Sequence, residues 1–455
     1  MVMICNQLTH GVSTLDPLAD HTIDSAREEA FRPPRPSAPF SEEWWCDFLA
    51  ETKNLNAPAV FAKAMGQDRV ASYQRAILDV VATLCELRTA DYGFRAYLDG
   101  HLLGGDGMEW VYDRPPRADE DLAQWTERVF QDRKFGFIIN AGEKFNQAFS
   151  KDVALLMTPL LKKVGIPRDG IQFTLFIGNY DKTPLGIHQD IRGENVTHFH
   201  VGPGRKLMYV WDKDHYNKLT TQDGLRRRDF AALRPHAQRF VIEAGDLFFM
   251  PEGTFHIGEQ EEISIGITVW QYTHTNKRFA QVMLNHAYQQ IKTVDGDAIV
   301  HDPNSPDNSD NIDDLLATHT LPHEFRNQDF GGLLKSAYVD WRHCIFSNAG
   351  YRNPPFQRKQ RTRFSREDSV QLEMPYRILA RMIEGTGKMI VYVRGYKLEM
   401  NGHACLLRLI DRINDGQIHP VAELLDLLDK AWSEKVGTYL LSELHLYHGI
   451  CRMPL

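Results

Sequence analysis

A histidine and an aspartate lie two residues apart in the stretch GIHQD, residues 186–190. The stretch follows IQFTLFIGNY (171–180), whose apolar, β-branched and aromatic residues are typical of a buried strand. Alternate side chains of a strand share a face, so His188 and Asp190 are expected to point into one space. They are either a hydrogen-bonded pair in a polar turn or two of the three ligands of a metal site.

The motif G-x5-P-x-G-x2-H in GDLFFMPEGTFHIGEQ (245–260) offers a third ligand, His256. Its proline and second glycine suit a sheet corner, where lost ladder bonds are tolerated, so the histidine is expected to face inward on the next strand. His256 lies 66 positions after Asp190, which allows several strands between them. Two imidazoles and one carboxylate form the facial triad that suits Fe(II) and leaves positions for a cosubstrate and O2. Zinc also accepts three protein ligands, so the set does not fix the metal.

These motifs resemble known ones. The glycine–proline–histidine spacing resembles the second cupin motif, and HQD resembles the H-x-D part of a cupin oxygenase motif. Lys206 lies 16 residues beyond Asp190, on a predicted strand in VGPGRKLMYVW (201–211), and no arginine occurs 10–16 residues past His256. Many small-molecule oxygenases place an arginine there, whereas JmjC enzymes use a strand lysine. The chain therefore resembles, over residues 130–275, the JmjC/cupin-like Fe(II)- and 2-oxoglutarate-dependent oxygenases, of the asparaginyl-hydroxylase and ribosomal-oxygenase branch.

The resemblance implies roles for individual residues. His188, Asp190 and His256 would hold Fe(II), and Lys206 would pair with the distal carboxylate of 2-oxoglutarate. It also implies further cosubstrate residues: Thr183 shortly before His188, Thr268 and Trp270 on the final core strand, and Asn140 before the core. Two extra residues separate the threonine of KTPLGIHQD from the histidine, compared with the family pattern.

The fold class follows from the change of pattern between 171 and 272. Short strand-like runs separated by Gly, Pro and Asp predict a sandwich or barrel. We expect a mainly β core, a double-stranded β-helix of the cupin or jelly-roll type, with flanking helices. Helical periodicity predicts helices at 41–52, 69–87, 121–131, 145–165 and 276–294.

We expect four parts along the chain: a flexible N-terminal arm (1–40), an oxygenase domain with a helical N-terminal elaboration (41–294), a loop, helix and basic linker (295–370), and a winged-helix-like domain (371–455). The linker prediction includes a solvated acidic loop, DPNSPDNSDN. In the last part, helices are predicted at 375–385, 403–416, 421–432 and 437–450, with one or two strands between the first two.

The composition is that of a globular protein, with 43% hydrophobic and 25% charged residues among 455. A net charge of -8 argues against a general nucleic-acid-binding protein and leaves open a local basic patch. The sequence contains no run of about 18 apolar residues, so no membrane span is expected. The N-terminus has no secretory signal pattern. The six cysteines form no C-x-x-C pair, which indicates free thiols and a cytoplasmic protein.

Several residues admit a second interpretation. His198 and His200 form a rival ligand pair on one strand face, although no carboxylate accompanies them. Glu194 lies four residues beyond Asp190, where metal-binding cupins often have a fourth ligand. The only dense basic run, within 351–368, is either a solvated linker or a groove for an acidic peptide or nucleic acid.

The resemblance implies a dioxygenase that hydroxylates an unactivated C–H bond. The lysine anchor and the extra domain favour a peptide or protein side chain, such as that of a precursor peptide in a biosynthetic pathway. The alternatives are hydroxylation of a free amino acid or other small metabolite, a non-catalytic JmjC-like binding module, and a metal-dependent cupin isomerase or hydrolase. A winged helix can also serve as a dimer module, which leaves a homodimer open. No membrane partner is expected.

Overall fold

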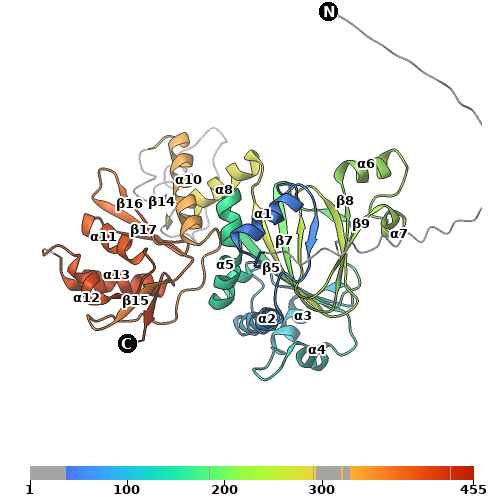
Figure 1. Cartoon of the computed structure of the whole chain (residues 1–455), viewed down its shortest axis with the longest axis horizontal. Coiled ribbons are helices and arrows are strands. Elements are labelled where there is room, and N and C mark those ends of the chain that lie inside the picture. The colour runs from blue at the N-terminus through green and yellow to red at the C-terminus, as the bar shows by residue number, and fades with distance from the viewer. Residues whose placement is uncertain are drawn as a thin grey trace, which may run out of the picture. The chain divides into compact units, whose positions relative to one another are not determined.

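The computed structural model describes residues 37–183, 185–290, 292–293, 319–320, 328–430 and 432–454 (Figure 1). Most of the predicted arm (1–40) and the whole of the predicted acidic loop (302–311) therefore lie outside the described residues. The boundaries of the four predicted parts stay predictions.

Eight antiparallel strands form the core: β5 (Ile171–Gly178), β6 (His188–Gln189), β7 (Glu194–Pro203), β8 (Lys206–Trp211), β9 (Gln238–Ile242), β10 (Leu247–Met250), β11 (Phe255–Glu259) and β12 (Ser264–Tyr272). They contribute four strands to each of two sheets, with the orders β10-β7-β12-β5 and β6-β11-β8-β9, and the chain crosses between the sheets after every strand except β8, which pairs directly with β9. This is the topology of a double-stranded β-helix, so the predicted mainly β, jelly-roll fold class is confirmed.

The larger sheet is extended at both edges. Strand β1 (Ala59–Phe61) pairs with β10, and β4 (Phe135–Ile139), β2 (Arg95–Leu98) and β3 (His101–Leu102) continue outward from β5. The apolar stretch FGFII forms β4, and all five of its residues are buried. Because β10 and β5 both have neighbours, neither edge of the core sheet presents a free ladder there.

Alternation along the central strands separates two environments. On β12, Ile265, Ile267 and Val269 are fully buried in the main hydrophobic cluster, which also holds apolar residues of the flanking helices. The intervening positions Thr268 and Trp270 face the opposite way and line a cavity. One face of the sheet therefore forms the core, and the other face is left for chemistry.

The flanking helices are α1 (Glu42–Glu51), α2 (Gln67–Leu87), α3 (Gly105–Tyr112), α4 (Leu122–Phe130), α5 (Gln147–Val164), α6 (Lys213–Thr221), α7 (Phe230–Leu233) and α8 (Asn276–Gln289). The five helices predicted from periodicity are confirmed as α1, α2, α4, α5 and α8. Ser41 caps α1 by accepting a hydrogen bond from the backbone N–H of Trp44, and α5 continues through Pro159. The short helices α3, α6 and α7 were not predicted.

Beyond the core lie β13 (Lys292–Thr293), β14 (His319–Thr320), α10 (Phe330–Ser347), β15 (Ser369–Leu372), β16 (Leu379–Ile383), β17 (Lys388–Val393), β18 (Tyr396–Asn401), α11 (Ala404–Ile413), β19 (His419–Pro420), α12 (Val421–Asp426), α13 (Glu434–Leu446) and β20 (Ile450–Met453). The helix predicted at 375–385 is wrong, because β16 occupies 379–383 and pairs with β17. Its neighbour β17 is rich in β-branched residues, and this pairing overrides a helical pattern. The winged-helix-like assignment stays a prediction.

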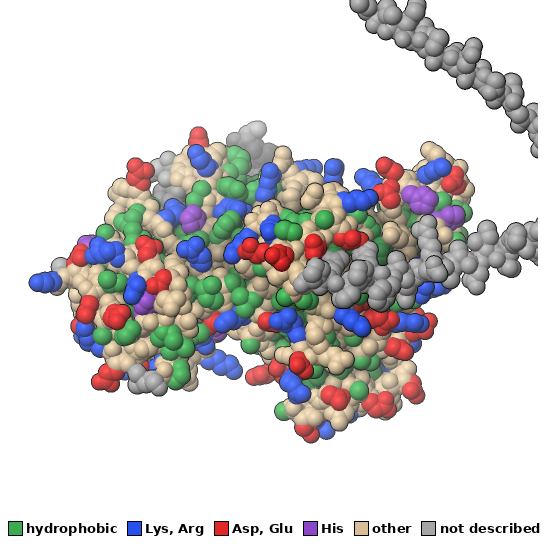
Figure 2. All heavy atoms as spheres, in the orientation of Figure 1, with side chains coloured by type: hydrophobic (Ala, Val, Ile, Leu, Met, Phe, Trp, Pro, Cys, Tyr) green, Lys and Arg blue, Asp and Glu red, His purple; other side chains and the backbone are tan. Residues whose placement is uncertain are grey.

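The arginines of the predicted basic linker mostly meet carboxylates of the same chain. Arg361 pairs with Glu443, and Arg366 pairs with both Asp426 and Glu434. Charged side chains of both signs are interspersed over the face seen in Figure 2. This internal pairing favours the linker interpretation over a groove for an acidic partner.

Two predictions from composition can be compared with the described residues. Their five cysteines are all free: Cys46, Cys85, Cys344, Cys405 and Cys451. None of the helices in the described ranges has the length and apolar character needed to cross a bilayer.

Candidate active site

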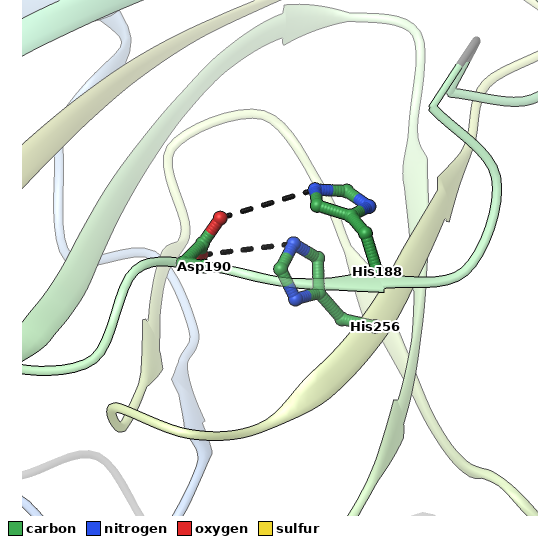
Figure 3. Close-up of side chains that lie close together, drawn as sticks. All are labelled: His188, Asp190 and His256. Atoms are coloured by element: carbon green, nitrogen blue, oxygen red, sulfur yellow. Dashed lines mark ion pairs between the residues drawn. The ribbon is translucent and has the colours of Figure 1, made fainter.

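Three side chains predicted as metal ligands meet between the two sheets (Figure 3). The Nε2 atom of His188 lies 3.9 Å from Asp190 Oδ1, and His256 Nε2 lies 3.8 Å from Asp190 Oδ2. One donor atom from each residue falls within 4.8 Å of the others. Ligand bonds near 2.1 Å place neighbouring donors about 3 Å apart, so a modest side-chain adjustment would let all three reach one ion.

Strand pairing brings the two histidines together. His188 on β6 is the register partner of His256 on β11, and their ring centroids are 4.3 Å apart. Asp190 follows directly after the two-residue strand β6. Gly186 and Gly253, with φ of +65° and +77°, turn the chain immediately before these strands. The long interval between the ligands is thus spanned by strands β7 to β10.

The hydrogen bonds of the two imidazoles prepare them for a metal. His188 Nδ1 lies 2.9 Å from the carbonyl of Gly186, and His256 Nδ1 lies 3.3 Å from that of Thr254. A carbonyl only accepts, so each Nδ1 carries the proton and each Nε2 keeps its lone pair. Burial lowers the pKa of His256 to about 4, which keeps this ring neutral.

Asp190 completes a donor set that fits a divalent cation. Its Oδ2 is buried and has no hydrogen-bond partner among the described residues. A buried carboxylate oxygen without a donor is costly, and a cation beside it removes that cost. The 2-His-1-carboxylate set on the page suits Fe(II), and it would also accept zinc.

Lys206 lies in the same cavity, at the start of β8. Only 7% of the residue is exposed, and it makes no ion pair with any residue in the described part of the chain. Its Nζ lies 5.5 Å from the ring centroid of Phe176. Burial lowers the pKa of this ammonium to about 8. A buried cation without a counter-charge is unfavourable on its own and is typical of a site that binds an anion.

A glycine makes the room around Lys206. A Cβ added at Gly258 would lie 3.2 Å from Lys206 Cε, 3.2 Å from Thr183 Oγ1 and 3.1 Å from Met208 Sδ. Thr183 in turn donates to the carbonyl of Gly258 and accepts from its N–H, both at 3.2 Å. Thr183 and the stem of Lys206 therefore both lie over Gly258, and the threonine hydroxyl is already bonded to the backbone.

The other predicted cosubstrate residues lie in cross-strand rows of the larger sheet. Thr174 donates to Asn140 Oδ1 at 3.1 Å and accepts from Trp270 Nε1 at 3.0 Å. Thr268 pairs in register with both Thr174 and His198. Thr174, which was not predicted, thus links two of the predicted residues. Its period-two position on β5 was the only available signal.

The cavity that holds all these residues has a volume of about 460 Å³. The aromatic residues that line it include Phe248 on β10 and Trp270 on β12. Phe249 points to the other face of the sheet, where its ring packs edge-on against Phe48 at 5.4 Å. The alternation of β10 explains this difference, since Phe248 and Phe249 are consecutive.

The rival ligands do not join the metal-binding group. His200 Nε2 lies 2.7 Å from the carbonyl of Gly204, and no carboxylate groups with His198 and His200 among the described residues. Glu194 lines the cavity and yet lies outside the group of three. Burial, and then the charge of Asp190, raises the pKa of Glu194 to about 7.

No protein-family model matches the sequence, and no curated protein matches it. Among solved structures, the chain is similar to the ribosomal oxygenase YcfD from Escherichia coli, with a TM-score of 0.44 and 14% identity over 90% of this chain and 98% of that one. The complex of YcfD with cobalt and succinic acid gives the same values, and that with cobalt and 2-oxoglutarate gives 0.42 and 13% over the same shares.

Proposed function

We propose that this protein is an Fe(II)- and 2-oxoglutarate-dependent dioxygenase that hydroxylates an unactivated C–H bond of a peptide or protein side chain. The observation that supports the proposal is the meeting, in one cavity, of a 2-His-1-carboxylate set with a buried lysine that has no counter-charge among the residues the structure describes. The metal set alone would also suit a hydrolase. The buried ammonium of Lys206 favours binding of an anionic cosubstrate, which a hydrolase would not need.

Each residue has a defined task in this proposal. His188 and His256 present Nε2 lone pairs, and Asp190 offsets part of the charge of the cation. Lys206 binds the distal carboxylate of 2-oxoglutarate beside Thr183. Bound Fe(II), with O2 and 2-oxoglutarate, would supply the oxidising chemistry, in which 2-oxoglutarate becomes succinate and CO2.

The walls of the cavity control what reaches the metal. Phe248 and Met250 on β10 and Trp270 on β12, the two strands that flank β7, face the cavity and leave few polar groups for bulk water on that side. Such a surface holds a C–H bond near the metal without competing for it by hydrogen bonds. The protein therefore orients the substrate and excludes water.

A metal- and cosubstrate-binding experiment tests the reaction class. Under nitrogen, the protein should bind one Fe(II) and then one 2-oxoglutarate, and in air it should release succinate. Asp190→Ala and His188→Ala should lose both metal binding and succinate release. His215→Ala, which removes an exposed histidine on α6, is the matched control and should change neither. Metal-dependent turnover in the absence of O2 and 2-oxoglutarate would instead identify a cupin hydrolase or isomerase.

The residues at the rim of the cavity favour a peptide or protein as the substrate over a small metabolite. Leu185 and Ile191 line it and are 55% and 56% exposed. Exposed apolar side chains beside a site are typical of a surface that contacts a partner chain. Leu185→Ser should raise the KM for a peptide substrate by several-fold. The same change should leave the KM for a free amino acid unchanged, and a panel of both, followed by succinate release, separates the two classes.

We also propose a cytoplasmic location. The five free cysteines among the described residues support it, because thiols stay reduced there. A fractionation experiment with a tagged full-length chain tests it. Recovery in an oxidising compartment would overturn it.

A further inference from the structure

A buried histidine in the cavity has an unused nitrogen. His198, on β7, is 5% exposed, and its Nδ1 lies 2.9 Å from the Thr268 hydroxyl on the neighbouring strand. Its Nε2 is buried and has no hydrogen-bond partner among the described residues. The residue lines the same cavity as the metal ligands and Lys206. Buried polar atoms nearly always have a hydrogen-bond partner, so a ligand bound in the cavity is the expected partner of this nitrogen.

The position of the ring shows which part of the cavity it faces. A Cβ added at Gly266 would lie 2.0 Å from His198 Cε1 and 2.7 Å from His198 Nε2, so the ring lies directly over this glycine. Gly266 is the register partner of Phe176, and the ammonium of Lys206 lies over that phenyl ring. The His198 ring therefore lies over the part of β12 that pairs with Phe176, at the lysine end of the cavity.

The ring is neutral and can act as a directional donor. Burial, and then the charge of Lys206, holds the pKa of His198 well below its usual value. A neutral imidazole carries one proton, on either nitrogen. When the Thr268 hydroxyl donates to Nδ1, the proton lies on Nε2 and points into the cavity. An anion at the lysine end would favour this tautomer.

We infer that His198 Nε2 and Lys206 Nζ together bind the distal carboxylate of 2-oxoglutarate, one oxygen each, and that Thr268 fixes the donor tautomer of the histidine. This inference rests on the proposed function. It changes the predicted role of Thr268, which then acts through His198 and does not itself contact the cosubstrate. The ammonium of Lys206 attracts the carboxylate, and the hydrogen bond from His198 Nε2 fixes its orientation.

Two ligands that differ at one end provide the test. 2-Oxoglutarate and 2-oxobutyrate share the keto-acid group, and only 2-oxoglutarate has the distal carboxylate. Their Kd values are measured by anaerobic calorimetry on the Co(II)-loaded full chain. His198→Phe keeps a ring and removes both nitrogens. It should weaken 2-oxoglutarate binding by about 10- to 100-fold, the range for a buried hydrogen bond to a charged group, and leave 2-oxobutyrate binding unchanged.

Two further variants separate a bond from a packing effect. His198→Gln keeps an N–H donor and should recover part of the lost affinity for 2-oxoglutarate. Thr268→Val should weaken binding of 2-oxoglutarate alone, whereas Thr268→Ser should retain it. Thermal melts of each variant establish that the fold is intact.

The outcomes are distinct. Equal 2-oxoglutarate affinity in folded His198→Phe and the natural protein would overturn the inference while leaving the proposed function standing. An equal loss for both ligands would also overturn it, since the histidine would then support the metal end. If the natural protein binds neither ligand, the proposed function itself fails and takes the inference with it.

Discussion

Replacing Lys206 with methionine should stabilise the free protein and remove its response to 2-oxoglutarate. Lys206 is buried beside Phe176 and has no counter-charge among the described residues. Methionine keeps the length of the stem and removes the charge, and it matches the apolar surroundings. A residue that is unfavourable for folding and required for binding is the expected signature of a functional site.

The magnitude follows from the pKa of the lysine. Burial lowers the pKa of Lys206 from 10.5 to about 8, so the folded state disfavours the ammonium. Because the folded-state pKa is depressed, stability is lost as the pH falls from 10.5 through 8, and the full loss is present at pH 7. The difference corresponds to about 3 kcal/mol. Lys206→Met should therefore raise the free energy of unfolding at pH 7 by up to about this amount.

Urea unfolding at pH 7 and pH 10, with and without Co(II) and 2-oxoglutarate, measures both effects. The stabilisation of the variant should be largest at pH 7 and shrink toward pH 10. Saturating 2-oxoglutarate at 100 times its Kd should stabilise the natural protein by about 2.7 kcal/mol and the variant far less. Lys213→Met, on the exposed surface of α6, is the control. A variant that is less stable at pH 7 and still binds 2-oxoglutarate normally would show that Lys206 is a structural residue and not the anchor of the cosubstrate.

Other perturbations have equally definite outcomes. The affinity for 2-oxoglutarate should fall about tenfold per pH unit above pH 8, as Lys206 loses its proton, which calorimetry across that range would show or contradict. Burial raises the pKa of Glu143 to about 7, so the free energy of unfolding should decrease by about 3 kcal/mol as the pH rises from 4.5 through 7. In Glu143→Gln, urea unfolding over this pH range should lack that decrease. Gly258→Ala should raise the Kd for 2-oxoglutarate by crowding the lysine, with metal affinity as the unaffected control. Gly266→Ala should displace the His198 ring and weaken the same binding, and an unchanged Kd would show that the ring can move at no cost.

Much of the core was predictable because its strands obey a simple period. β5 and β12 alternate apolar core residues with cavity residues, so their faces can be read from the sequence. The expectation that His188 and Asp190 point into one space also agrees with the structure, although for a different reason. Strand β6 contains only His188 and Gln189, so Asp190 is placed by the end of this short strand and by the turn at Gly186, and not by alternation along a continuous strand.

The remaining features depend on the register between strands, which a single sequence does not encode locally. The bond between His198 and Thr268 requires β7 and β12 to pair in one register, which shifts at Ile265/Gly266. The chain of Asn140, Thr174 and Trp270 likewise joins three different strands or strand ends. The error at 375–385 has the same origin, because pairing with β17 decided the conformation.

In the proposed function, one ferrous ion, held by His188, Asp190 and His256, completes the binding site for 2-oxoglutarate. The most direct measurement is an anaerobic titration of 2-oxoglutarate into the protein with and without Fe(II). We expect one equivalent bound with the metal, weak binding without it, and loss of the metal-dependent part in Asp190→Ala. Binding that is unaffected by the metal, or that survives Asp190→Ala unchanged, would show that these three residues do not hold a metal that binds 2-oxoglutarate.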